Sequence, residues 1–162
     1  MKSKLLKHSA IWAIALVIFT AVTAQLSVIA ATDNNISFSF EIMAGMEPNH
    51  DKNGQRRSTS DVNNAWKVKL ISSNEPTKAH PDGSAKTATK FYLGINNHSV
   101  KKNEVGSIQY NVLEGDEAKY YAAYQKASPA NVYLYGRDNN KTNHSYGVTG
   151  VWDEETGKKP IY

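Results

Sequence analysis

The sequence contains no cysteine among its 162 residues. This absence excludes disulfide bonds, thiolate metal sites and lipid attachment through a cysteine side chain. Exported domains often gain stability from disulfides, because the oxidising exterior preserves them. Any exported domain in this chain therefore has to be stabilised by the burial of apolar side chains.

Motifs that carry catalysis are missing as well. No serine stands in a GxSxG nucleophile elbow, and neither a P-loop nor a Rossmann glycine pattern occurs. The histidines show no HxH or HExxH spacing, which would bring metal ligands together locally. We therefore predict no catalytic residues, no cofactor and no metal site, and we expect that the protein is not an enzyme.

The first 31 residues have the pattern of a secretory signal peptide. Lys2, Lys4 and Lys7 precede the apolar run AIWAIALVIFTAVTA, and the small residues of SVIAAT follow it. A basic start, an apolar helical centre and a small-residue exit are typical of a leader that is removed during export. The sequence therefore predicts a signal peptide over residues 1–31.

We expect the leader to be cleaved after Ala30 or Ala31, which places small or apolar residues at the peptidase subsites. The alternatives are cleavage after Ala24 and retention of the leader as a membrane anchor. Its apolar centre is short for the roughly 20 residues of a membrane span. Residues 32–162 are thus predicted to form one secreted, extracellular domain, with membrane contact only through the leader before cleavage.

A strong charge of one sign is absent from this domain. The whole chain has 19 Lys and Arg against 15 Asp and Glu, and removal of the three leader lysines leaves 16 against 15. Phosphate binding requires clustered cations, and no dense run of one sign occurs in residues 32–162. A nucleic-acid partner is therefore disfavoured.

Six segments of the domain alternate apolar and polar residues with the period of two that is typical of β-strands. The predicted inward positions are Ile36, Phe38, Phe40 and Ile42; Trp66, Val68 and Leu70; Phe91, Leu93 and Ile95; Ile108, Tyr110 and Val112; Val132 and Leu134; and Tyr146, Val148 and Trp152. Lys67 and Lys69 are expected on the outward face of the second segment. One face of each strand can then enter a shared core.

Clusters of Pro, Asn, Asp and Gly separate these segments and predict turns. The stretch RDNNKTN, residues 137–143, predicts a hairpin between the last two strands. The leading fold is an all-β antiparallel β-sandwich of immunoglobulin-like size with about six or seven strands. Residues 116–128 fit both strand and helix periods, and we favour one short helix near 117–127, or a strand that passes into one.

The acidic triplet Asp153, Glu154 and Glu155 ends the last strand. Paired carboxylates can divide acid and base roles when burial separates their pKa values. Neighbouring residues on a strand point to opposite faces, however, so two adjacent acids do not share a cleft while the strand continues. We interpret the triplet as a solvated exit from the sheet, and a hydrolase that uses these carboxylates is the alternative.

A second polar stretch resembles part of a calcium-binding loop. Asn49, Asp51, Asn53 and Gly54 occupy its first, third, fifth and sixth positions, but Ser60 stands where a bidentate Glu is needed. No helices are predicted on either side. A loop without an ion is the favoured interpretation, and a weak ion site is the alternative.

Tyrosine is the candidate for ligand contact. If Val132 and Leu134 face inward, Tyr133 and Tyr135 face outward, and Tyr121 joins them from the preceding segment. An exposed aromatic stripe can stack on sugar rings or cover a protein surface at low entropic cost. The alternative is that tyrosine simply suits half-buried strands.

Several segments together resemble a family of small exported Gram-positive bacterial proteins defined by a domain of unknown function, family 2712. They are ISFSF (36–40), RRSTS followed by NNAWKVKL (56–70), KFYL (90–93), YYAAYQKAS (120–128), NVYL (131–134) and GVWDEETG (150–157). NxWKVxL and GxWDEET are the most specific of these motifs. The resemblance implies a secreted bacterial protein with an all-β fold and transfers no catalytic residues.

The leading functional hypothesis is a non-enzymatic extracellular or cell-envelope-associated binding module. Its partner would be a cell-wall glycan or another extracellular protein, which contacts the tyrosine-bearing face. The alternative is a secreted antagonistic protein, similar to a bacteriocin, because such proteins share the leader, the small size and the lack of cysteine.

Overall fold

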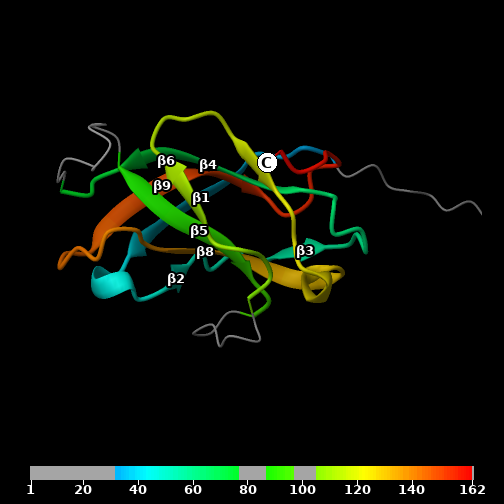
Figure 1. Ribbon diagram of the computed structural model, residues 1–162, viewed down its shortest axis with the longest axis horizontal. Coiled ribbons are helices and arrows are strands. Elements are labelled where there is room, and N and C mark those ends of the chain that lie inside the picture. Colours follow the sequence, from blue (N-terminus) through cyan, green and yellow to red (C-terminus); the bar gives the residue numbers. More distant parts are fainter. Residues whose placement is uncertain (1–31, 77–86, 97–104, 162) are drawn as a thin grey trace, which may run out of the picture. The chain divides into compact units, whose positions relative to one another are not determined.

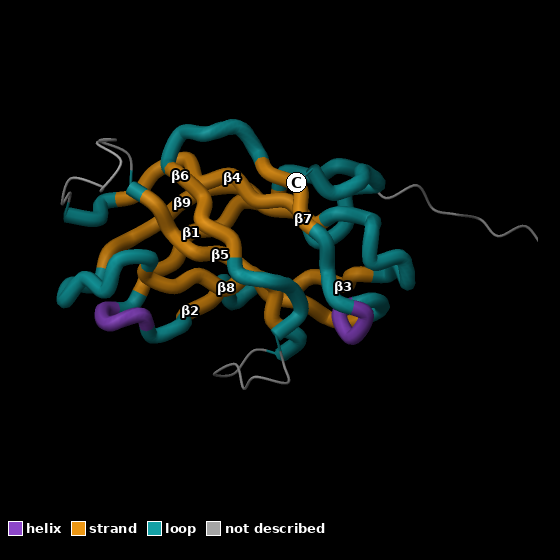
Figure 2. Tube along the Cα trace, viewed as in Figure 1, coloured by secondary structure: helices purple, strands orange, loops and turns teal. Residues whose placement is uncertain are grey.

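Strands dominate the computed structural model, which describes residues 32–76, 87–96 and 105–161 (Figures 1 and 2). The predicted signal peptide, 1–31, lies outside these residues. The strands of the described part are β1 (Ile36–Ile42), β2 (Asn49–His50), β3 (Gln55–Arg57), β4 (Trp66–Ser73), β5 (Ala88–Gly94), β6 (Tyr110–Leu113), β7 (Lys119–Tyr121), β8 (Ala130–Asp138) and β9 (Tyr146–Asp153). Two 3-10 turns, η1 (Ala44–Met46) and η3 (Gln125–Ala127), are its only helical elements. No helix in the described ranges has the length and apolar character of a membrane span.

The strands form two antiparallel sheets, as the period-two alternation predicts. Sheet one has the order β1-β9-β4-β7, and sheet two has the order β2-β8-β5-β6, with β3 also paired to β8 (Figure 1). Every strand pairing is antiparallel. The all-β sandwich is therefore confirmed, and the strands beyond the expected six or seven are short ones.

The core lies between the two sheets and consists of the inward residues of both. Phe38 of β1 packs on Phe91 of β5 with ring centroids 5.5 Å apart, and such aromatic pairs contribute about 1 kcal/mol beyond their buried area. Trp66 and Trp152 are completely buried in the same cluster. Burial of these side chains supplies the stability that disulfides cannot give to a chain without cysteine.

A second aromatic cluster links the two sheets at one pair of edges. Tyr110 of β6 stacks on Tyr121 of β7 with centroids 3.8 Å apart, and Trp66 contacts both rings. The Trp66 indole also donates a hydrogen bond of 3.2 Å to the carbonyl of Ala122. These rings bridge the edge strand of sheet two and the edge strand of sheet one.

The predicted hairpin over residues 137–143 is wrong. β8 pairs with β2, β3 and β5, whereas β9 pairs with β1 and β4, so the connection crosses from one sheet to the other. Asp138 shapes this crossing, because its carboxylate accepts hydrogen bonds from the backbone N–H groups of Asn140 and Thr142. An Asx turn therefore replaces the two-stranded ribbon that the Asn-rich sequence suggested.

Two smaller expectations need correction, and one alternative is decided. Lys67 is buried, with an exposed fraction of 3%, although it lies on the outward face of β4. Ile108 precedes β6 and is 55% exposed, so it does not enter the core. The segment near 117–127 is the strand β7 followed by the single 3-10 turn η3, which matches the strand-into-helix alternative.

Candidate functional site

The acidic triplet after β9 is not a solvated exit from the sheet, and that interpretation is wrong. The Asp153 side chain is completely buried. One carboxylate oxygen accepts the backbone N–H of Glu155 at 3.0 Å, and the other accepts the N–H of Asn34. Burial raises the pKa of Asp153, although these two hydrogen bonds and the charge of Lys67 oppose the rise.

The other two acids have different environments. Glu155 accepts hydrogen bonds from the backbone N–H of Ser58 and Thr59, at 3.1 and 2.8 Å, and from the Ser58 hydroxyl. Glu154 is half-buried, and its Oε2 atom is buried without a hydrogen-bond partner in the described part of the chain. Burial raises the pKa of Glu154 to about 7, helped by the negative charges of its two acidic neighbours.

Arg57 of β3 lies at the centre of this region and is completely buried. Its Nε donates to the Ser128 hydroxyl at 2.8 Å, and its two terminal nitrogens donate to the backbone carbonyls of Asp61, Asn64 and Glu154. Burial lowers the pKa of the guanidinium, and the nearby acids oppose that change. The charge is thus stabilised by carbonyl dipoles and by carboxylates at longer range.

The hydrogen bonds of this region connect side chains to the backbone of distant segments, so its role is structural. The donors of Arg57 are directed at the Ser128 hydroxyl and at backbone carbonyls, and the oxygens of Asp153 and Glu155 are occupied by backbone N–H groups. It joins three stretches that are far apart in the sequence, at 56–64, at 128 and at 153–156. We call Arg57, Ser128, Asp153, Glu154 and Glu155 the arginine lock.

A second polar cluster holds the first described residues on sheet one. Asp33 accepts from the amines of Lys67 and Lys158 and from the Tyr120 hydroxyl at 3.0 Å. Lys67 also donates to the Asn35 side chain at 2.9 Å, which explains how an outward lysine is buried. Burial opposes ionisation of Asp33, but the hydrogen bonds from its three partners outweigh it and lower its pKa to about 2.

Part of the stretch that resembles a calcium loop forms the strand β2. Asn49 belongs to β2, and its side chain donates to the Glu41 carbonyl at 2.7 Å. Asp51 is buried, and it accepts the backbone N–H of Asn53 at 3.0 Å in an Asx turn. Within the described ranges, no group of three or more His, Asp or Glu side chains could hold a metal ion.

The tyrosines chosen for ligand contact lie in two separate places. Tyr121 is 9% exposed and belongs to the aromatic cluster with Trp66 and Tyr110. Tyr133 is half-buried on β8, and Tyr135 is only 1% exposed on the same strand. The expectation of three exposed rings is therefore wrong for Tyr121 and Tyr135, and only Tyr133 retains an accessible surface.

Tyr135 is nevertheless part of a row of rings on the outer face of sheet two. The ring of Tyr92 on β5 stacks on Tyr135 at 5.4 Å, and the imidazole of His50 stacks on Tyr135 at 4.7 Å. Tyr133 meets His50 edge to face at 5.9 Å. The Tyr135 hydroxyl donates to the Asn96 carbonyl at 2.8 Å. We call Tyr92, Tyr135, His50 and Tyr133 the aromatic row.

Sequence reasoning missed His50 and Tyr92 as members of this row. Both lie directly opposite Tyr135 in the register, on β2 and β5, and residues opposite each other share a face of the sheet. The glycines at positions 94 and 54 are the sequence signal for this row, because they leave room for a ring beside the backbone. A Cβ atom at either position would clash with the ring of Tyr135 or Tyr133, respectively.

A family model matches residues 26–156, which is most of the chain. The protein belongs to the DUF2712 family. This family is described as proteins of unknown function, so membership brings no activity with it. No curated protein and no solved structure matches the chain.

The DUF2712 match includes every residue of the arginine lock and of the aromatic row. The motifs that carried the resemblance in the sequence meet at the lock, since Arg57 comes from RRSTS, Asn64 from NNAW, and Glu154 from WDEET. In this DUF2712 protein, these three segments thus help to hold the fold together.

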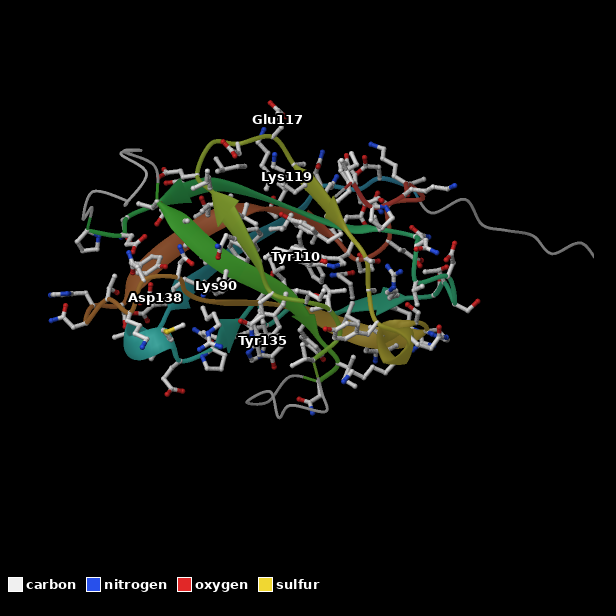
Figure 3. The ribbon with its side chains drawn as sticks, viewed as in Figure 1. Lys90, Tyr110, Glu117, Lys119, Tyr135 and Asp138 are labelled. Carbon is white, nitrogen blue, oxygen red and sulfur yellow. The ribbon has the colours of Figure 1, made fainter. Side chains whose placement is uncertain are left out.

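Basic side chains lie next to the aromatic row. Lys90 of β5 is directly opposite Arg137 of β8, and Arg56 of β3 is opposite Asn131. Figure 3 shows the Lys90 and Tyr135 side chains in the same region of sheet two. Arg137 is half-buried; one terminal nitrogen donates to Gln109 at 3.5 Å, and its Nε has no hydrogen-bond partner in the described residues.

Proposed function

We propose that this DUF2712 protein is a secreted, non-enzymatic binding module that works outside the cell or at the cell envelope. The observation that carries the proposal is the aromatic row on the outer face of sheet two. His50 and Tyr133 are half-buried, so both residues keep part of their surface exposed to solvent. Aromatic rings of this kind bind sugar rings or apolar protein surfaces.

The packing of the row favours binding because it fixes the accessible rings in advance. Tyr135 is 1% exposed and stacks on the His50 ring, and Tyr92, which is 2% exposed, stacks on Tyr135 in turn. A ligand that docks on a ring already held in place does not have to immobilise it, and the entropic cost of binding falls accordingly. A glycan or protein ligand could therefore use a small contact area effectively.

The acids after β9 support a non-enzymatic role. The carboxylates of Asp153 and Glu155 accept backbone hydrogen bonds, and the Glu154 carboxyl is buried at its Oε2 atom. A general acid or base needs to reach a substrate proton, which groups engaged in this way do not readily do. If a hydrolytic activity were detected, its persistence in Asp153→Asn and Glu154→Gln variants would remove these carboxylates as its source.

Binding is tested with the protein as its bacterial host processes it, mixed with purified cell walls and with extracellular proteins of the same host. We expect the wild type to sediment with one of these fractions. Tyr133→Ala should weaken the binding about tenfold, the usual cost of losing one accessible ring at a binding surface. Tyr124→Ala is the matched control, because Tyr124 is 41% exposed and lies outside the row.

Two outcomes would contradict this proposal. The first is a wild-type protein that binds neither cell walls nor extracellular proteins. The second is an equal loss of binding in the Tyr133 and Tyr124 variants, because the row would then have no special role. Thermal unfolding of both variants is measured alongside, so that a loss of fold is recognised.

Secretion is tested by mass spectrometry of the culture medium and of the membrane fraction. The proposal expects the mature protein in the medium, with Ala31 or Thr32 as its first residue after cleavage at the expected positions. Recovery of the intact chain from membranes alone would overturn the secreted role and favour a retained anchor.

A further inference from the structure

We infer that the outer face of sheet two binds an anionic polysaccharide. Sugar rings would pack against Tyr133 and His50, and a negatively charged group would lie between Lys90 and Arg137. This inference rests on the proposed function and specifies the chemical class of its ligand.

The first observation is the direct pairing of two cations. Lys90 and Arg137 are opposite each other in the register of β5 and β8. Like charges in opposite positions of an antiparallel pair destabilise it, because their Cβ atoms are only about 5 Å apart. Neither side chain makes an ion pair within the residues that the structure describes. A bound oxyanion would relieve this repulsion and bind to both cations.

The second observation is the unsatisfied guanidinium. The Arg137 Nε is buried without a hydrogen-bond partner in the described ranges, and the contact of its terminal nitrogen with Gln109 is long, at 3.5 Å. A guanidinium presents parallel N–H donors that match the two oxygens of a carboxylate or a phosphate. The buried Nε is closed to a ligand, but the contact of the terminal nitrogen with Gln109 is long and exposed, so the terminal nitrogens are the donors for an anion.

The third observation is the composition of the face. Its positions on β8 are Asn131, Tyr133, Tyr135 and Arg137, and the residues opposite them on neighbouring strands are Arg56, Gly94, His50, Tyr92 and Lys90. No Asp or Glu occurs among these nine residues. The face therefore combines aromatic rings with cations, and it attracts negative charge.

The order of these residues indicates a polymer of rings that carries charges at intervals. Arg56 is opposite Asn131, and Lys90 is opposite Arg137, so about 20 Å of strand separates the two basic positions. The aromatic row lies between them. A neutral glycan would make no use of the cations, and a polyanion without rings would make no use of the Tyr133 and His50 rings.

The inference is tested with three defined probes at two salt concentrations. Hyaluronan oligosaccharides carry carboxylates on alternate sugar rings, chitin oligosaccharides carry rings without charge, and inorganic polyphosphate carries charge without rings. We expect hyaluronan to bind at least tenfold more tightly than either of the others, and its affinity to fall as salt rises.

The matched variants separate the contributions of charge and rings. The double variant Lys90→Gln/Arg137→Gln should lose about tenfold in hyaluronan affinity and most of its salt dependence. Tyr133→Ala should lose a similar factor and keep the salt dependence. Lys69→Gln is the control, because Lys69 is a half-buried lysine on the other sheet, where it pairs with the exposed Glu117 at 3.6 Å.

The outcomes of these binding measurements distinguish a failure of the anionic-polysaccharide inference from a failure of the proposed function. Cell-wall binding that depends on Tyr133 but not on salt, Lys90 or Arg137 would overturn the anionic ligand and leave the proposed function standing. Polyphosphate binding that equals hyaluronan binding, with no effect of Tyr133→Ala, would overturn the requirement for sugar rings. Absence of binding to all probes, to cell walls and to extracellular proteins would remove both proposals.

Discussion

The ring of Tyr135 on β8 lies against Gly94 at the end of β5, so closely that a Cβ atom on Gly94 would clash with it. The two residues are diagonal neighbours, because Tyr135 is opposite Tyr92 and Gly94 is opposite Tyr133. The missing side chain at position 94 therefore provides the space in which Tyr135 lies and on which the aromatic row depends.

Gly94→Ala should consequently destabilise the protein by about 2 kcal/mol, since the ring or the backbone has to move. The displacement should also alter the near-ultraviolet circular dichroism of the tyrosines. Gly147→Ala is the matched control, because the nearest atom to its Cβ would be the Asn74 Oδ1 at 3.6 Å, an ordinary contact. Equal stabilities of the two variants in urea unfolding would contradict the close approach.

Arg57 and Arg56 provide a second comparison, since they are neighbours on β3 with opposite burial. Arg57→Ala removes the donors for the carbonyls of Asp61, Asn64 and Glu154, and we expect a loss of about 4 kcal/mol in the free energy of unfolding. Arg56→Ala removes an exposed side chain and should change stability by less than about 0.5 kcal/mol. Similar urea midpoints for both variants would argue against the lock.

Asp33 should make the protein sensitive to acid. Its pKa is lowered to about 2 in the folded protein from an ordinary value of 3.8, so its ionised form is stabilised by folding. This stability is fully present above about pH 4 and is lost as the pH falls towards 2. Because the cluster is partly exposed to solvent, we expect a contribution of about 1 kcal/mol.

Asp33→Asn should lack this dependence between pH 4 and pH 2 and should be less stable than the wild type at neutral pH. The free energy of unfolding at several pH values measures the difference. Parallel curves for variant and wild type over this interval would show that the ionised carboxylate of Asp33 does not stabilise the folded protein.

Glu154 should have the opposite effect, because its pKa is raised to about 7 from 4.5. The folded protein then binds a proton that the unfolded chain releases, so stability decreases as the pH rises from about 4.5 to about 7. Glu154→Gln should remove about 2 kcal/mol of this decrease, and a smaller remainder is expected from Asp153, whose pKa burial also raises. Glu117→Gln is the control, since the Glu117 side chain is 92% exposed and should leave the slope unchanged. An unchanged slope in Glu154→Gln would assign it to another group.

The alternation of residue types predicted much of the strand content. The segment 36–42 is β1 with the expected bounds, and its inward residues Phe38 and Ile42 are buried. Trp66, Val68, Leu70, Leu134 and Trp152 are also buried as predicted. This success has a simple cause, since successive side chains of a strand point to opposite faces whatever its neighbours are.

The candidate site was predicted less well. The sequence directed attention to Tyr133 and Tyr135, but it gave no reason to add His50 from a short strand in a polar loop. It also suggested a hairpin between β8 and β9, which belong to different sheets. Pairing depends on residues far apart in the chain, and a local pattern does not contain that information.

The amino-acid sequence by itself determined the absence of disulfides, the strand character of most segments and, for most of the predicted strands, the face that enters the core. Only the tertiary structure decided that Lys67, Asp153 and Tyr135 are buried, although each was expected in water. The reason is that the outward face of a strand is exposed only where no other segment packs on it. The residues from 33 to 35 contact Lys67 and Asp153, and the strand β2 brings His50 onto Tyr135.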